Sequence, residues 1–415
     1  MDIILFILSL FLGGAAYNLW RPVYTPPTLA SISFLFGFGA NLFALHLFLE
    51  CLLFIGLFAW LNVYTSTLDI ISITLLVISA VAFLVFHLRG YNAQDEVERA
   101  LTEGLGKDYT NEVGEEFTKL FAKGVSFKTM LWPFPQDLPG VEIIKDIAYG
   151  SHPIQKLDIY RKQSHGQLRP VLLQIHGGAW TEKLGSKNEQ ARPLMNHMAL
   201  RDWVCVSTGY RLSPSATLPD HIIDVKSALI WVKENIEAYG GDPNFIIATG
   251  GSAGGHLCSL LALSANDVRF QPDRPEVDTT VQGCVPYYGA VDVLDDSNTA
   301  PSNGLEEIMT NRVIKQSRDA APELWESISP MRRVDENAPP FFVICGDKDT
   351  LVPVASNAAF AQKLREHSKN SVSYAQIADA QHAFDMTRTP HSEFVVQGIE
   401  RWLAHQYSNH LNRAT

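Results

Sequence analysis

The stretch FIIATGGSAGGH, residues 245–256, joins an apolar run to a glycine-flanked serine and the start of a helical pattern. Gly250, Ser252 and Gly254 fit the motif G-x-S-x-G, and the apolar helical sequence HLCSLLALSA follows. A tight strand-to-helix turn holds such a serine in strained dihedrals and exposes its hydroxyl as a nucleophile. The helix amino terminus also favours negative charge that develops beside the serine. The stretch therefore predicts a nucleophile, Ser252, at the end of a buried strand.

Strand-like and helix-like stretches alternate on both sides of this turn, from about residue 141 onward. Helical patterns lie near residues 190–200, 220–239, 253–264, 303–318, 356–368 and 391–407. They separate eight apolar runs: EIIKDIAY, QKLDIYR, PVLLQIH, WVCVSTGY, FIIATG, QGCVPYYG, FFVICG and SVSYAQI. Strands that alternate with helices form a mostly parallel sheet with helices on both faces. The pattern thus predicts an α/β catalytic domain over residues 141–415.

A second glycine-rich turn lies upstream, where HGGAW at residues 176–180 follows the apolar run PVLLQI. A glycine pair after a strand suits a loop whose backbone N–H groups bind an oxyanion. We expect Gly177 and Gly178, together with the N–H of Ala253, to form this oxyanion hole. The loss of one such donor typically costs about 2.7–4 kcal/mol of transition-state stabilisation. His176 itself is expected to be a structural hydrogen-bonding group.

An acid and a base follow downstream of the nucleophile. FFVICGDKDTLVP places Asp347 and Asp349 at the end of a strand, and QHAFD places His382 after the last strand. A serine, an acid and a histidine in this order are the triad order of α/β-hydrolases. The histidine takes the serine proton and later protonates the leaving group, while the carboxylate fixes its tautomer. Spacing alone does not choose between the two aspartates.

The charge distribution divides the 415 residues into two unequal parts. Residues 1–90 hold five of the 77 charged side chains and a net charge of −1, and the other 325 residues hold 72 and a net charge of −10. This division excludes a wholly soluble protein. It also excludes a simple transporter, because the larger part contains no further set of long apolar segments. The acidic larger part argues against a nucleic-acid partner.

The low-charge part contains three apolar segments, at residues 3–20, 28–64 and 70–88. At 1.5 Å per residue, the outer two just cross a hydrocarbon core about 30 Å thick. The middle segment is too long for one straight span and too short for two. We expect one long tilted span or one span plus an interfacial extension, and hence a three-helix transmembrane domain over residues 1–90. The first segment lacks the basic start of a signal peptide, so we expect it to be retained.

Sparse basic residues indicate the orientation of these segments. Arg21 and Arg89 follow the first and third segments, whereas the 62–69 loop contains no lysine or arginine. The positive-inside rule then places the catalytic domain in the cytoplasm and the protein in the cell membrane as a multi-pass protein. His46 and Glu50, four residues apart, share a helical face inside the membrane. They form either a functional ionisable pair or a pair that joins helices.

Residues 91–140 connect the two parts, first with charged helical sequence and then with an amphipathic stretch at residues 119–135. This stretch suits a helix at a bilayer surface or over a pocket, and packing against the catalytic domain is an equal alternative. We therefore interpret 91–140 as an amphipathic linker or cap. The five cysteines include no C-x-x-C pair, and we expect buried, reduced thiols rather than a disulfide framework or a metal site.

Together these motifs resemble a known family. HGGAW, GYRLSPSATLPDHIIDVKSALIWVKENIEAYGGDP, GGSAGGH, GDKDTLVP and QHAFD follow one another as in α/β-hydrolases of the hormone-sensitive-lipase type. Residues 141–410 look most like the bacterial carboxylesterases of this type with membrane-spanning amino termini. The resemblance implies an α/β-hydrolase fold with an eight-stranded sheet. It also implies that Asp349 is the acid, that Asp347 is structural, and that esters are hydrolysed without a metal or an organic cofactor. Ala179 departs from the third glycine of many members, which keeps the N–H group but changes the outer wall of the hole.

The sequence therefore predicts a membrane-anchored serine carboxylesterase or lipase that acts on lipophilic, short- to medium-acyl esters, with the substrate and the lipid bilayer as its partners. Amide or formamide hydrolysis by the same machinery is the alternative, and a catalytically silent, membrane-tethered binding module is a third interpretation. Family position places Trp180, Tyr287 and Tyr288 at a substrate pocket, and core packing is equally compatible with each. The amphipathic stretch suggests that substrates enter from the bilayer.

Overall fold

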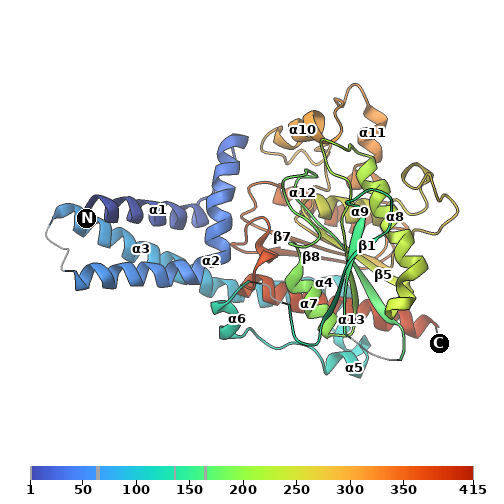
Figure 1. The fold of residues 1–415 in the computed structure, drawn as a ribbon, viewed down its shortest axis with the longest axis horizontal. Coiled ribbons are helices and arrows are strands. Elements are labelled where there is room, and N and C mark those ends of the chain that lie inside the picture. Colours follow the sequence, from blue (N-terminus) through green and yellow to red (C-terminus); the bar gives the residue numbers. More distant parts are fainter. Residues whose placement is uncertain (1, 62–65, 135–136, 163–165, 415) are drawn as a thin grey trace.

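The computed structural model describes residues 2–61, 66–134, 137–162 and 166–414, in which an elongated helical bundle joins an α/β domain (Figure 1). The bundle consists of α1 (Asp2–Trp20), α2 (Pro27–Trp60) and α3 (Thr67–Arg89). Each of these helices is long and apolar enough to cross a membrane. A capping box starts α3: the Ser66 hydroxyl accepts the N–H of Asp69, whose carboxylate accepts the N–H of Ser66.

The second helix consists of two halves that point in different directions. Phe43 leaves the helical region at φ −123° and ψ 22°. Residues 44–60 run alongside α1 and α3, whereas residues 27–42 turn across the end of the bundle and lie between it and the α/β domain (Figure 1). Of the two expectations, one long tilted span is therefore wrong because the helix is kinked, and one span plus an extension describes the chain. The 62–69 loop falls partly outside the described residues.

The α/β domain is built on one eight-stranded sheet, in the order β1-β2-β4-β3-β5-β6-β7-β8. β2 pairs antiparallel with both β1 and β4, and all the other pairs are parallel. This agrees with the predicted mostly parallel sheet and its eight apolar runs. The strands are β1 (Glu142–Ala148), β2 (Lys156–Arg161), β3 (Arg169–Ile175), β4 (Val204–Thr208), β5 (Gly241–Gly251), β6 (Gly283–Tyr287), β7 (Phe341–Gly346) and β8 (Val372–Ile377).

Helices cover both faces of the sheet because alternate side chains of its central strands point to opposite sides. On β3, Val171, Leu173 and Ile175 pack into one core, and Leu172 packs into the other. The first core lies under α8 (Asp220–Asn235), α9 (Ala253–Ala262) and α12 (Val354–His367). The second lies under α4 (Ala93–Leu105), α7 (Arg192–Leu200) and α13 (Pro390–Ala414). The short helices are α5 (Glu115–Thr118), α6 (Phe127–Leu131), α10 (Gly304–Ile308) and α11 (Pro322–Ser327).

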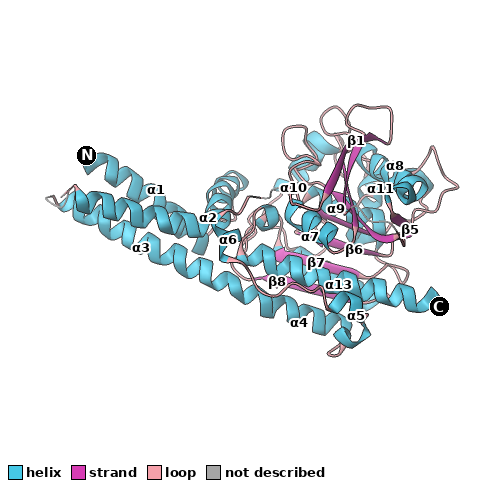
Figure 2. Cartoon of the chain, turned by 60° about the horizontal axis from the view of Figure 1, so that its bottom comes forward, coloured by secondary structure: helices cyan, strands magenta, loops and turns pink. Residues whose placement is uncertain are grey.

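The bundle and the α/β domain share a nearly continuous helical rod. One 3₁₀ turn, Gly90–Asn92, joins α3 to α4, and α4 then packs against β8 and α13 (Figure 2). The chain that leaves the bundle thus becomes part of the covering layer at the β8 edge of the sheet. This arrangement brings the first half of α2 and the end of α3 close to the loop that follows β8.

The amphipathic stretch does not form the continuous helix that its pattern suggested. Gly124 adopts a φ of 73°, which stops a helix from forming through this residue, and Pro133 follows closely after α6. Of the residues that the structure describes in this stretch, only the five of Phe127–Leu131 are helical. Several large apolar side chains of this stretch are exposed: Leu120, Phe127, Leu131, Trp132 and Phe134. All five cysteines are buried and free, as expected.

Candidate active site

The nucleophile candidate lies where β5 turns into α9. Ser252 has φ 58° and ψ −120°, a positive-φ conformation that a non-glycine residue adopts only under strain. The turn is held by the Ser252 N–H, which donates to the Tyr287 carbonyl at 3.0 Å. A Cβ atom on Gly254 would lie 2.1 Å from the carbonyl oxygen of Ile175, so only glycine allows α9 to approach β3 this closely. The motif therefore folds into the predicted strand–turn–helix.

The acid and the base come from the ends of β7 and β8. Nδ1 of His382 lies 2.7 Å from Oδ2 of Asp349, and both side chains are buried. The other carboxylate oxygen, Oδ1, accepts the N–H groups of Leu351 and Val352 at 2.8 Å each. The Asp349 carboxylate is therefore held in place by the chain that follows it. This arrangement fits a carboxylate that fixes one histidine tautomer.

The second aspartate of the same strand end has a different contact. Oδ1 of Asp347 accepts the N–H of Asp379 at 2.6 Å, and burial raises the pKa of the Asp347 carboxyl. Asp347 thus stabilises the loop that leads to His382, whereas Asp349 contacts the imidazole of His382. The geometry favours Asp349 over Asp347 as the acid, a choice that spacing alone left open.

Gln381, which the sequence analysis did not single out, joins the two loops of the site. Its Oε1 accepts the N–H of His382 and the N–H of Thr350, each at 2.9 Å. One amide therefore links the residue after Asp349 to the histidine itself. Gln381 opens the QHAFD motif, but the motif does not show this role, because the role depends on two loops that meet only after the sheet has formed.

The proposed oxyanion-hole residues lie around the same turn. Gly178 has φ 112°, and a Cβ there would collide with the Leu184 carbonyl, so glycine is required. The N–H of Gly177, by contrast, donates to Oε1 of Gln190 at 2.5 Å. The Gly177 N–H is therefore engaged by a side chain, and Gln190 shapes this loop. Gly178 and Ala253 remain the better-placed candidates for oxyanion donors.

The structure places the neighbouring histidines in structural positions. His176 is buried, with Nδ1 2.8 Å from the Gly177 carbonyl oxygen and its ring stacked on Tyr210 at 4.5 Å. His256 is buried too, with Nε2 2.8 Å from the Ile328 carbonyl oxygen. Burial lowers the pKa of each to about 4. Both are thus uncharged packing residues at neutral pH.

The aromatic residues expected at the substrate pocket separate into two groups. Ser252 opens into a cavity of about 740 Å³, and Trp180 contributes to its wall. Tyr287 and Tyr288 are buried and do not belong to this wall. The Tyr288 ring instead lies 4.5 Å from the His382 ring, and its hydroxyl donates to Asp385.

Helices of the bundle also reach this site, although nothing in their sequence predicted a catalytic role. The Phe34 ring of α2 lies 6.0 Å from the His382 ring, edge to face. Nδ2 of Asn41 donates to the Asp379 carbonyl at 3.3 Å, and Nε of Arg89 donates to the Asp379 carboxylate at 2.5 Å. Two helices of the bundle therefore contact the loop that carries the histidine.

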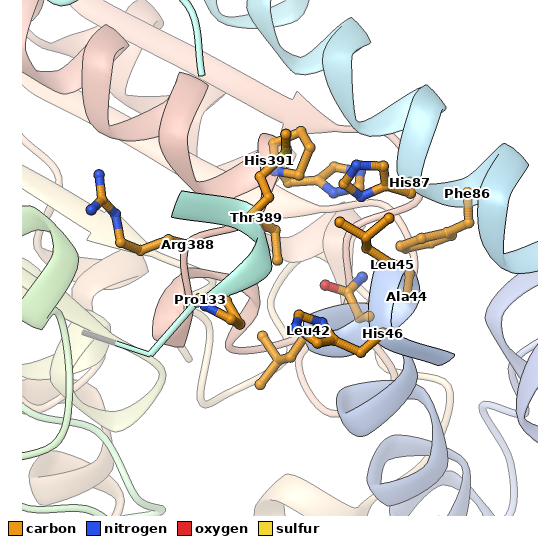
Figure 3. A pocket seen from close by; sticks show the side chains of 13 residues that line it. Leu42, Ala44, Leu45, His46, Phe86, His87, Pro133, Arg388, Thr389 and His391 are labelled. Atoms are coloured by element: carbon orange, nitrogen blue, oxygen red, sulfur yellow. The ribbon is translucent and has the colours of Figure 1, made fainter. Parts of the chain in front are cut away.

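A second, much smaller cavity marks the junction itself. It measures about 10 Å³, the size of a single water molecule. His46 of α2, His87 of α3 and His391 of α13 border it together with Arg388 (Figure 3). The described contact of His46 in this region is with the Leu131 carbonyl oxygen, at 3.1 Å, so this residue connects α2 to α6. Within the described residues, no group of three or more His, Cys, Asp or Glu side chains is arranged to hold a metal ion.

The sheet order, the strained serine turn and the paired aspartate and histidine define the class: this is an α/β-hydrolase. Solved structures show the same fold. A truncated carbohydrate esterase from gut microbiota matches 67% of this chain and 100% of its own length, with a TM-score of 0.52 and 22% identity. The butyrate-bound esterase Est2 of Thermogutta terrifontis matches 67% of this chain and 96% of its own, with a TM-score of 0.53 and 21% identity. At these identities the likeness concerns the fold alone.

Sequence relatives are more specific. Residues 157–364 match the BD-FAE family. The probable carboxylic ester hydrolase LipM of Mycobacterium tuberculosis is 42% identical over 341 residues, which are 80% of this chain and 77% of LipM. Esterase LipQ of the same organism is 43% identical over 64% of this chain and 63% of LipQ. An isoprenylcysteine alpha-carbonyl methylesterase of Arabidopsis thaliana is 27% identical over 54% of this chain and 53% of the plant protein.

The chain therefore belongs to the BD-FAE family of hormone-sensitive-lipase-type α/β-hydrolases, and it is a carboxylic ester hydrolase.

Proposed function

We propose that this protein is a membrane-anchored serine carboxylesterase in which Ser252, His382 and Asp349 form the catalytic triad. One observation carries the proposal. The Asp349–His382 pair is held by Gln381 beside the cavity on which Ser252 opens. We further propose three units: a transmembrane domain at 1–90, a linker at 91–140 and the catalytic domain at 141–415.

The chemistry follows from the geometry of these groups. His382 accepts the Ser252 proton as the hydroxyl oxygen attacks the ester carbonyl, and the Asp349 carboxylate stabilises the resulting imidazolium. The oxyanion forms beside the N–H groups of Gly178 and Ala253, at the amino terminus of α9. The imidazolium then protonates the departing alcohol, which leaves an acyl group on Ser252. Water activated by His382 attacks this acyl-enzyme and releases the acid.

The bundle is proposed to span the membrane through α1, the carboxyl-terminal half of α2 and α3. The 19 residues of α1 extend about 29 Å, close to the thickness of a hydrocarbon core. Arg21 and Arg89 both lie at the catalytic end of this bundle, which favours a cytoplasmic catalytic domain.

This orientation is tested with Lys369→Cys, which adds an exposed thiol to a chain whose described native thiols are buried. In intact cells the new thiol should resist a membrane-impermeant maleimide and should react once the cells are permeabilised. Labelling of intact cells would place the catalytic domain outside.

The catalytic proposal is tested with the purified full-length protein in detergent and a series of p-nitrophenyl esters of increasing acyl length. Ser252→Ala should lower kcat by about six orders of magnitude, to background. Ser259→Ala is the matched control, because that serine lies on the same helix and its hydroxyl donates to the Gly255 carbonyl, away from the cavity wall. Activity that survives in Ser252→Ala would refute the mechanism. A matched anilide hydrolysed faster than the ester would reassign the enzyme as an amidase.

A further inference from the structure

The cavity beside Ser252 has one wall from the membrane-proximal chain and another from the catalytic domain. Tyr24, Pro27, Ala30 and Ser31 come from the chain that enters α2 and from its first turns. The rest of the described wall comes mainly from residues 290–308 and 350–356. A substrate in this cavity would therefore touch both parts of the protein. Neither part alone encloses the space.

The half-helix at residues 27–42 has two different faces. Ala30, Ser33, Gly37, Ala40 and Asn41 are buried toward the protein, at helical spacing. On the opposite side, the large exposed side chains are all apolar. They are 39–66% exposed and comprise Leu29, Ile32, Leu35 and Phe36. An apolar face of this kind is unfavourable in water and favourable in the boundary region of a bilayer.

The position of this half-helix indicates that the boundary region of a bilayer covers its apolar face. It lies across the end of the helical bundle, at the level where helices of membrane-spanning length meet the α/β domain (Figure 1). Its Phe36 ring lies 5.6 Å from the Phe11 ring of α1, so its apolar face continues the exposed apolar side of the bundle.

Exposed aromatic side chains from the linker lie at the same end of the bundle. The Phe134 ring lies 5.5 Å from the Phe43 ring at the kink of α2 and 5.8 Å from the Trp132 ring. Aromatic residues of this kind are enriched where membranes meet water. The half-helix thus borders the cavity with its first turns and carries, on its outer face and at its kinked end, a surface suited to the membrane interface.

The catalytic wall of the cavity is acidic. Its described residues include one guanidinium, from Arg318, and five carboxylates, from Asp292, Asp295, Asp296, Glu306 and Glu307. Asp296 is paired with Arg332 at 2.5 Å, and the Asp292 carboxylate accepts backbone N–H groups of its own loop. Glu306 and Glu307 are exposed at the start of α10. A cleft lined by one sign of charge lowers the local concentration of ligands of that sign.

We infer that the substrate is an uncharged, lipophilic ester that reaches Ser252 from the bilayer along the half-helix 27–42, and that the acidic wall excludes anionic esters such as phosphate-bearing lipids. The inference rests on the proposed function, because it names the substrate class of the same serine site. The lipophilic ester enters from the bilayer, and the carboxylates of the cavity wall favour uncharged esters over anionic ones.

Charge selection is tested with two esters that share one acyl chain: monodecanoylglycerol and the corresponding lysophosphatidate, in mixed micelles with the full-length protein. The neutral ester should have a kcat/KM at least about tenfold higher at low salt. The ratio should fall toward one in 1 M NaCl, where the Debye length is about 3 Å. It should also fall in the double variant Glu306→Gln/Glu307→Gln. Equal hydrolysis of the two esters, or a preference that neither salt nor the variant changes, would overturn the inference.

The role of the half-helix is tested with two adjacent substitutions. Ser31→Trp places an indole at the cavity wall, whereas Ile32→Trp places the same side chain on the face that points away. Ser31→Trp should lower the ratio of decanoyl to acetyl p-nitrophenyl ester hydrolysis, and Ile32→Trp should preserve that ratio. An equal effect of the two variants would rule out this wall as a substrate contact.

Different results would refute the proposed function and the inferred substrate class. If p-nitrophenyl acetate is not hydrolysed in a Ser252-dependent manner, the proposed function is wrong. If that hydrolysis is present but decanoyl esters show no discrimination by charge, only the substrate class is wrong.

Discussion

Nε of Arg89, at the last position of α3, lies 2.5 Å from Oδ2 of Asp379, three residues before the proposed catalytic His382. The guanidinium also lies over the Trp20 ring of α1, 5.4 Å from its centroid. The buried Asp379 carboxylate is thus compensated by a cation from the helical bundle. The bundle therefore contributes to the position of the histidine loop, in addition to its proposed role as a membrane anchor.

The first prediction concerns this ion pair. Arg89→Ala should lower kcat about ten- to a hundredfold with little change in KM, because the loop loses its support while the cavity keeps its wall. Arg89→Lys should restore part of the activity, since it keeps the charge. Steady-state kinetics on a p-nitrophenyl ester measure both effects. Arg161→Ala removes a comparable pair with Glu142 at the far edge of the sheet and serves as the control. The same loss of kcat in both variants would argue against a positioning role.

The second prediction concerns the close approach of α2 to the same loop. A Cβ atom on Gly37 would lie 3.0 Å from Nε2 of Gln381, which holds His382, and 3.0 Å from Nδ2 of Asn18. A Cβ on Gly39 meets nothing within 4 Å. Gly37→Leu should therefore push Gln381 away and lower kcat several-fold. Gly39→Leu, with the same change two residues later, should keep the wild-type value. Kinetics on the two variants decide the point, and matching values would mean that α2 does not press on the loop.

The third prediction separates the two aspartates. Asp349→Asn should lower kcat by about four orders of magnitude, because the amide no longer fixes the productive tautomer of His382. Asp347→Asn keeps an oxygen that can accept the Asp379 N–H, so it should cost far less. The ratio of the two kcat values is the measurement. Comparable losses would leave the choice of acid open, and a larger loss at Asp347 would reverse it.

The fourth prediction concerns Tyr288. Burial raises the pKa of the Asp385 carboxyl, and the hydrogen bond from the Tyr288 hydroxyl opposes this effect. Tyr288→Phe removes that bond in a buried place and should destabilise the fold by about 1–3 kcal/mol. KM should change little, because Tyr288 is not part of the cavity wall. Thermal unfolding and steady-state kinetics report the two effects. A large rise in KM would instead support the substrate contact that family position suggested.

The fifth prediction concerns acid stability. Burial lowers the pKa of His176, His256 and His391 from 6.5 to about 4. The unfolded chain therefore binds protons that the folded protein does not bind. Stability present above pH 6.5 should be lost as the pH falls from 6.5 to 4, with each histidine contributing up to about 3 kcal/mol. Tm measured in detergent by intrinsic fluorescence should fall over this range.

A pair of variants tests the source of that acid sensitivity. His256→Asn removes one buried titrating group, so its Tm should depend less steeply on pH. His367→Asn removes an exposed histidine of α12 and should keep the full decline. A decline of equal steepness in the two variants would mean that His256 does not drive the acid loss.

The sequence by itself was sufficient for the features that neighbouring residues encode. The apolar run before Ser252 and the glycines around it specify a strand, a tight turn and a helix, because each depends on local sterics and periodicity. The alternation of strands and helices likewise indicated the parallel sheet. The order of Ser252, Asp349 and His382 then pointed to the hydrolase class before any contact was known.

Only the tertiary structure decided which distant residues meet. Nothing local indicates that Phe34 approaches His382, that Gln381 joins two loops, or that Gln190 occupies the Gly177 N–H. The kink at Phe43 could not be predicted, because the length of an apolar segment does not specify the direction of its two halves. Arg89 and Asp379 are 290 residues apart, and their contact exists because α3 continues into α4, which packs against β8. Packing between elements determines such contacts. The sequence therefore pointed to the chemistry of the enzyme but not to the contacts between the helical bundle and the loop that carries His382.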